Sequence, residues 1–280
     1  MKTFSRALTA TGVHLACVLL GASTSHAASL CQMDEIANGL ERSGLLAYSD
    51  GHYHDAEHAF VEAIRLTENQ GGPLAPGLTQ LLSDLAWLHY TEGRFDKADS
   101  LLREALARDQ KAFGPDDVER TAARTAELGM LYHAEGKFIE AGPLLHRALF
   151  LYEQSPKTQM CEIGIIQNQI GLNYWAMGDL VRGERLIKNA LVSLEVGETK
   201  DGRYWAAAML DFAELCLAGH RDAEAKRAFE RALTAAEDLR QSIGLDNGFV
   251  FHSHSVLLRR TEGIRTGRPI FGKIESCRAE

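Results

Sequence analysis

Long apolar runs are scarce in this chain of 280 residues. The stretch from Val13 to Ala22 is uncharged, but it is shorter than the roughly 20 residues that a membrane-spanning helix needs. No other stretch approaches that length. The sequence therefore predicts no membrane span.

The short apolar run instead fits a secretory signal peptide. It follows Lys2 and Arg6 and leads to small residues ending at Ala27, the pattern that a signal peptidase recognises. Residues 1–27 are thus predicted to be cleaved near Ala27, which leaves an exported chain, periplasmic or secreted. Lipid anchoring is the alternative, but His14 stands where a lipoprotein signal ahead of Cys17 needs Leu.

Basic charge is also lacking. Lys2 and Arg6 are the charged residues of the predicted signal peptide, so the rest of the chain has 28 basic and 38 acidic residues, a net charge of −10. Binding to phosphates needs clustered Lys and Arg. Because no basic stripe exists, we expect no nucleic-acid partner.

Metal-binding and catalytic patterns are sparse. Gly136-Lys137 lacks the neighbouring glycines of a phosphate loop, and no Ser-His-Asp grouping can be assembled. We expect no catalytic residues, no resident metal and no cofactor. An even number of cysteines in an exported chain permits disulfides in three connectivities, but free thiols fit as well, and both remain open. The cysteines beyond residue 27 have no C-x-x-C spacing: Cys31, Cys161, Cys216 and Cys277.

What the chain does have is a repeat of 42 or 43 residues. Four columns of residues recur in one register, three of small residues and one of large apolar residues. The first small column holds Ala63, Ala105, Ala148, Ala190 and Ala232, and the second holds Ala56, Ala98, Ala141, Gly183 and Ala225. The third holds Gly44, Ala86, Gly129, Gly171 and Ala213, and the large apolar column holds Phe60, Leu102, Leu145, Ile187 and Phe229.

The spacing within each repeat predicts two helices. The second helix carries the second, large and first columns, whose members lie four and three residues apart and so share one face. The first helix carries the third column. Small residues let helices approach closely, and large ones fill the remaining gap. The turns are marked by Gly51, Gly93, Gly136, Gly178 and, one residue early in its repeat, Gly219.

This pattern, clearest in LGMLYHAEGKFIEAGPLLHRAL, resembles the tetratricopeptide repeat, in the long-period subtype of kinesin light chains and many bacterial repeat proteins. The resemblance implies an all-α fold, a right-handed α-solenoid of helix-turn-helix repeats. Because a solenoid exposes an apolar face at its last repeat, residues 247–265 are predicted to form a capping helix, followed by a flexible tail, 266–280. The repeats are expected at 34–67, 78–112, 120–154, 162–196 and 203–243.

The resemblance also implies that the first helices line a concave groove that binds a peptide or extended segment. In each repeat the groove residues lie three residues before, one residue after and four residues after the residue of the third column. They form a strip rich in aromatic rings, which are enriched where partners bind. The candidate partner-binding residues are Tyr48, Trp87, Tyr90, Met130, His133, Asn168, Leu172 and Trp175.

We expect the five rings of this strip, Tyr48, Trp87, Tyr90, His133 and Trp175, to be exposed, although rings that pack between first helices would fit the same pattern. The basic clamp with which some family members hold acidic tails is missing, so an apolar or aromatic peptide is favoured. The matching places hold Glu41, Leu45, Ser83, Trp87, Ala126 and Met130.

The resemblance therefore favours a non-enzymatic, exported adaptor that binds a protein partner in its groove. Two other functions compete with this prediction. One is self-association, as a homo-oligomeric assembly scaffold of the cell envelope. The other is a metal-dependent hydrolase built on HDAEH, which fits the pattern H-x-x-E-H with His54 and His58 as zinc ligands and Glu57 as base. Ala56 belongs to a packing column, however, so both histidines should face solvent, with no cleft that excludes water.

Overall fold

The computed structural model describes residues 24–75, 77–114, 117–155, 160–196 and 202–239, with side chains from residue 35 to residue 235 except Pro73 and Arg203. Most of the predicted signal peptide, and all of the predicted capping helix and tail, lie outside these residues. The described helices belong to two parts that divide after Leu81, within α4.

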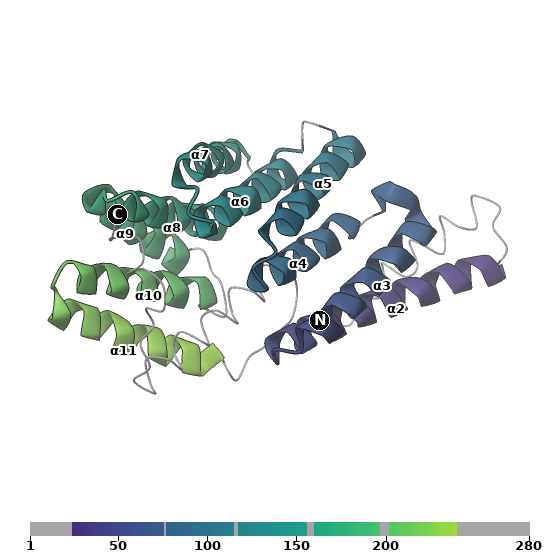
Figure 1. Ribbon diagram of the computed structural model, residues 1–280, viewed down its shortest axis with the longest axis horizontal. Helices are drawn as coiled ribbons and strands as arrows, with labels where there is room; N and C mark the ends of the chain where they lie inside the picture. The colour runs from purple at the N-terminus through teal and green to yellow at the C-terminus, as the bar shows by residue number, and fades with distance from the viewer. Residues whose placement is uncertain (1–23, 76, 115–116, 156–159, 197–201, 240–280) are drawn as a thin grey trace. The chain divides into compact units, whose positions relative to one another are not determined.

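The N-terminal part contains α2 (Thr24–Ser49), α3 (Tyr53–Gly71) and a short 3-10 helix, η1 (Gly72–Leu74) (Figure 1). The helices α2 and α3 pack against each other along the predicted columns. Phe60 is buried in this contact, and a Cβ atom added to Gly44 would lie 2.8 Å from its ring. The glycine therefore makes room for the large residue, as the columns predict.

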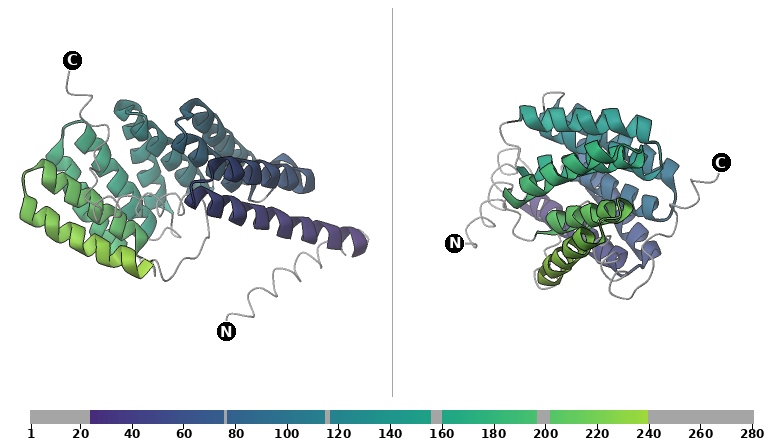
Figure 2. Two further views of the ribbon diagram at one scale, coloured as in Figure 1. Left: turned by 60° about the horizontal axis from the view of Figure 1, so that its bottom comes forward. Right: turned by 90° about the vertical axis from the view of Figure 1, so that its left-hand side faces the viewer.

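The C-terminal part repeats this arrangement in chain order, and Figure 2 shows its consecutive helices side by side. Each second helix also packs against the first helix of the next repeat: α5 on α6, α7 on α8 and α9 on α10. The predicted all-helical repeat fold is confirmed. The helices are α4 (Leu78–Thr91), α5 (Phe95–Phe113), α6 (Val118–Ala134), α7 (Phe138–Gln154), α8 (Met160–Ala176), α9 (Leu180–Val196), α10 (Arg203–Ala218) and α11 (Asp222–Leu239).

The left-handed residue of each turn recurs at the spacing of the repeat, even where the glycine does not. Four predicted turn glycines have a left-handed backbone: Gly51 (φ 81°), Gly93 (75°), Gly136 (79°) and Gly178 (87°). In the fifth repeat Gly219 has φ −89°, and the left-handed residue is His220, with φ 57°. Gly219 lies in the turn, as predicted, but the left-handed conformation follows the 42-residue spacing and falls on the next residue, although a residue with a Cβ atom adopts it less favourably.

None of the described helices is long and apolar enough to span a membrane.

Candidate partner-binding surface

The predicted strip lies on the first helices, but the structure buries half of it. Tyr48 is 3% exposed and Trp87 5% exposed, so the expectation that all five rings face solvent was wrong for these two. Met130 and Asn168 are buried as well. The remaining four residues are half-buried: Tyr90, His133, Leu172 and Trp175.

Packing against the next first helix explains the burial of Trp87. Its indole packs in a core cluster with Ala126 and Met130 of α6. Because Ala126 is small, it leaves space beside it that the indole can fill. Trp87 is thus one of the rings that pack between helices, the alternative that the sequence had left open.

The rings four residues after the third column have a second contact, across the turn of their own repeat. In three repeats such a ring meets the first residue of the second helix, five positions later. Aromatic pairs of this kind contribute about 0.5–1.5 kcal/mol beyond the burial of their area. The ring centroids are 5.8 Å apart in Tyr48–Tyr53, 5.7 Å in Tyr90–Phe95 and 5.3 Å in His133–Phe138.

Two hydrogen bonds link successive first helices at equivalent positions. Ser83 Oγ donates to Glu127 Oε2 over 2.8 Å, and Asn168 Nδ2 donates to Asp211 Oδ2 over 2.6 Å. In each bond the donor lies three residues before the third-column residue of its own repeat. The acceptor lies two residues before the third-column residue of the next repeat. We call these bonds polar rungs. Between α6 and α8 the donor position is occupied by Ala126, whose side chain cannot form a hydrogen bond.

Sequence reasoning missed the acceptors of these rungs. They belong to a polar column two residues before the third column: Asp84, Glu127, Gln169 and Asp211. The signal was available, since the column keeps the spacing of the repeat. Carboxylates on helices are usually solvated, yet Asp84, Glu127 and Asp211 are buried.

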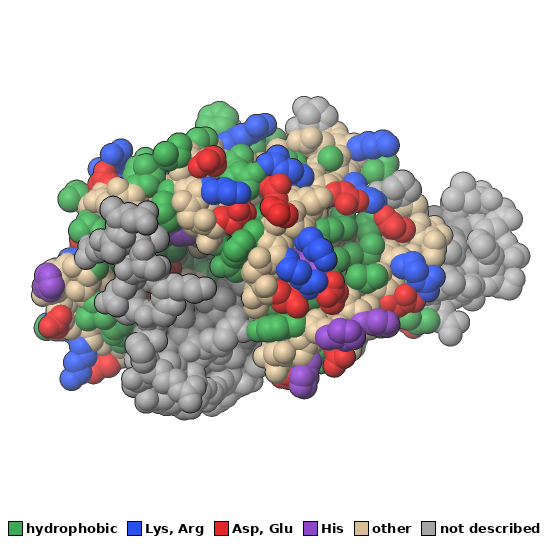
Figure 3. Space-filling model, in the orientation of Figure 1, with side chains coloured by type: hydrophobic (Ala, Val, Ile, Leu, Met, Phe, Trp, Pro, Cys, Tyr) green, Lys and Arg blue, Asp and Glu red, His purple; other side chains and the backbone are tan. Residues whose placement is uncertain are grey.

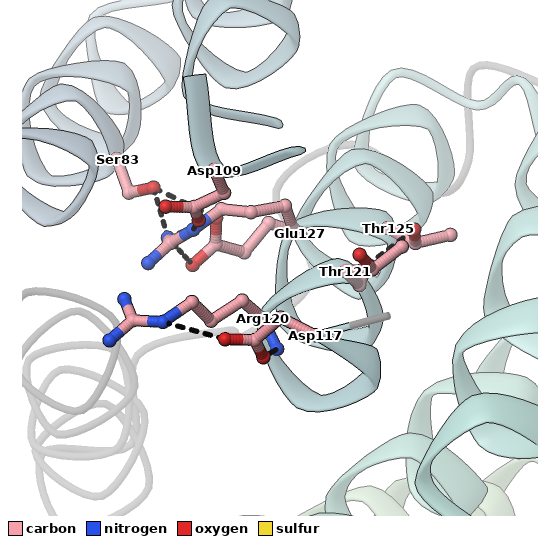
Figure 4. Close-up of polar contacts among 8 residues, drawn as sticks. Ser83, Asp109, Asp117, Arg120, Thr121, Thr125 and Glu127 are labelled. Atoms are coloured by element: carbon pink, nitrogen blue, oxygen red, sulfur yellow. Dashed lines mark hydrogen bonds and ion pairs between the residues drawn. The ribbon is translucent and has the colours of Figure 1, made fainter. Parts of the chain in front are cut away.

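A buried ion cluster adjoins the first rung, where α4, α5 and α6 meet (Figure 4). Arg124 Nε donates to Asp109 Oδ2 over 3.2 Å, and its Nη1 donates to both Glu127 oxygens over 2.8 Å and to Ser83 Oγ. Burial by itself would lower the pKa of Arg124, but Glu127 and Asp109 outweigh it and raise that pKa. The guanidinium therefore stays charged between two carboxylates.

His133 is held in one tautomer by its neighbour on α8. Its Nδ1 lies 3.2 Å from Asn173 Oδ1, while Asn173 Nδ2 donates to the carbonyl of Phe138 over 3.0 Å. Burial lowers the pKa of His133 more than Asn173 and Asp211 raise it. The neutral ring therefore donates from Nδ1 to the amide oxygen, which leaves Nε2 as an acceptor.

Part of the chain matches a known family. A family model described as "Tetratricopeptide repeat" matches residues 35–111. Residues 35–111 thus match the repeat that the sequence pattern resembles. A comparison with curated protein sequences finds no match.

Solved structures share the fold of this chain at low identity. BtubC (BKLC) from P. vanneervenii is 20% identical with a TM-score of 0.54, over 78% of this chain and 92% of that chain. NprR in complex with its cognate peptide NprX is 15% identical with a TM-score of 0.60, over 82% of this chain and 62% of that chain. Rap protein complexed with Competence and Sporulation Factor is 12% identical with a TM-score of 0.61, over 82% and 74%.

Two groups of residues had suggested other chemistry, the histidines of HDAEH and the cysteines. His54 and His58 are exposed on α3 and Ala56 is fully buried, as predicted. Cys161 and Cys216 are buried thiols that form no disulfide with each other.

Proposed function

We propose that this protein is a non-enzymatic adaptor that binds an extended peptide segment along the first helices α4, α6 and α8. The observation that carries the proposal is the row formed by Tyr90, His133 and Trp175. These rings occupy the same register position on three consecutive first helices, and each is half-buried, so part of its surface remains available to a partner.

The chemistry of the row favours a peptide with apolar or aromatic side chains. The rings of Tyr90 and Trp175, together with Leu172, provide apolar contact area. His133 Nε2 is an acceptor that suits a backbone N–H of an extended peptide. Two similar structures, NprR with NprX and Rap with Competence and Sporulation Factor, are complexes on the same fold, which supports a binding role.

The proposal includes export. Residues 1–27 have the composition of a signal peptide cleaved near Ala27, which would bring the mature chain to the periplasm or outside the cell. Its partner would then be a protein of the cell envelope or of the exterior.

The row can be tested with two matched double variants of the full chain. Tyr90→Ala/Trp175→Ala removes two rings of the row, and Ile139→Ala/Val181→Ala removes exposed side chains of the second helices. Immobilised proteins, each checked for helix content by circular dichroism, are used to capture envelope proteins, which are quantified by mass spectrometry. We expect at least one envelope protein to be captured in equal amounts by wild type and by the control variant. The ring variant should capture about tenfold less of it, or even less. Equal capture by all three proteins would contradict the assignment.

Self-association is the second candidate function, because the second helices expose apolar side chains in register. Ile139 and Val181, which are 79% and 81% exposed, occupy equivalent positions of α7 and α9. Phe150 and Val192 form another such pair and are also exposed. Figure 3 shows hydrophobic side chains on the surface over α7. Exposed apolar patches mark interaction sites when they are large and continuous.

Light scattering at increasing protein concentration tests this alternative. If the scaffold function holds, the molar mass of wild type should rise with concentration, and Ile139→Glu/Val181→Glu should remain monomeric because two charges cannot be buried between copies. A wild-type mass that stays at one chain over the whole range would exclude this function.

A further inference from the structure

We propose that His54, Asp55 and His58 form a surface binding site for one divalent transition-metal ion, a property beyond the proposed adaptor function. The three residues lie within five positions near the start of α3, in the N-terminal part of the chain. Together they offer two imidazoles and a carboxylate, a donor set that suits copper, nickel and zinc.

Helix geometry allows the two imidazoles to converge on one ion. Residues four apart on a helix have Cβ atoms about 5–6 Å apart, so one ion with metal–nitrogen distances of about 2.0–2.1 Å can bind both rings. The opposite face of α3 packs against the core through Ala56, Phe60 and Ala63, which fixes the orientation of this turn. His54 and His58 consequently point to solvent, and Figure 3 shows histidine side chains gathered over the start of α3.

Asp55 is the carboxylate placed to complete the site. Its Oδ1 lies 3.8 Å from His54 Nδ1, and the residue is three positions before His58, on a neighbouring part of the same turn. The other nearby acid, Glu62, is engaged by Arg65, whose Nε donates to it over 2.9 Å. This arrangement differs from the H-x-x-E-H interpretation, which assigned a role to Glu57.

The ligand atoms are available to an ion. The side chain of His54 is 95% exposed and that of Asp55 76% exposed, and His58 is exposed too. Within the part of the chain that the structure describes, neither imidazole is held by a hydrogen bond, so binding breaks no internal contact except the long one between His54 and Asp55. Three protein ligands leave coordination positions of the ion to water. Because the site is exposed to solvent, we expect it to bind the ion without catalysing hydrolysis.

Isothermal titration of the untagged full chain with CuCl2, NiCl2 and ZnCl2 tests the site. We expect one ion per chain, with copper(II) bound most tightly of the three, as the usual order of stability requires. His54→Ala and His58→Ala should each weaken binding about tenfold or more, and Asp55→Asn should weaken it less.

His146→Ala is the matched control, since His146 is exposed on α7 and has no histidine one turn away. Its affinity should equal that of wild type. The site is refuted if wild type binds no ion, if the His54 and His58 variants keep wild-type affinity, or if His146→Ala weakens binding as much as they do. All substitutions are on exposed positions, and circular dichroism checks that each variant keeps its helix content.

Discussion

Replacing Arg124 with Met should lower the free energy of unfolding of the C-terminal part by about 3–5 kcal/mol, because Asp109 and Glu127 would remain buried without their cation.

Urea unfolding followed by tryptophan fluorescence measures this effect, since the three tryptophans, Trp87, Trp175 and Trp205, all belong to the C-terminal part. Arg103→Met is the control: it breaks an exposed pair with Asp99 and should cost about 1 kcal/mol or less. A triple variant, Arg124→Met/Asp109→Leu/Glu127→Leu, should recover most of the loss, because an apolar cluster needs no counterion. If Arg124→Met costs no more than Arg103→Met, the cluster does not stabilise the fold.

Replacing Leu145 with Ala should cost about 2–5 kcal/mol, because this fully buried side chain fills the space between α6 and α7. Gly129→Ala should also destabilise the protein, since the added Cβ would lie 2.8 Å from Leu145 Cγ. Combined, the two changes should cost less than their sum by about 0.5–3 kcal/mol, because the smaller residue at 145 makes room for the new methyl group.

The same fluorescence assay measures this double-mutant cycle. Ile139→Ala, on the exposed face of the same helix, provides the control: combined with Gly129→Ala it should give a strictly additive loss. An additive result for Leu145→Ala with Gly129→Ala would mean that the two columns do not compete for the same space.

The repeat architecture was predictable because its small and large columns record direct contacts between helices. Leu145 meets Gly129, and Phe60 meets Gly44, in the pairing that the register indicated. In the fifth repeat the predicted glycine lies in the turn, but the left-handed conformation falls one residue later, on His220, which sequence reasoning did not single out.

The binding surface was predicted less well, because a column fixes the face on which a side chain lies but not how near the next helix comes. Trp87 and Tyr90 belong to the same strip, yet the small Ala126 on α6 leaves space in which Trp87 is buried. The acidic partners of the polar rungs were missed for a related reason. Asp211 resembles a solvated surface acid until Asn168 of the preceding repeat is placed against it.

The polar rungs and the ion cluster make the repeats unequal, although their columns look alike. Removal of the repeat formed by α6 and α7 would keep the spacing of the small residues but bring Asp109 against Ile166, which takes the place of Arg124 in the next repeat. A carboxylate that is 1% exposed would then face a hydrocarbon side chain. The order of the repeats is thus encoded by their buried polar residues, and a shuffled or shortened array of these same repeats would carry mismatched junctions.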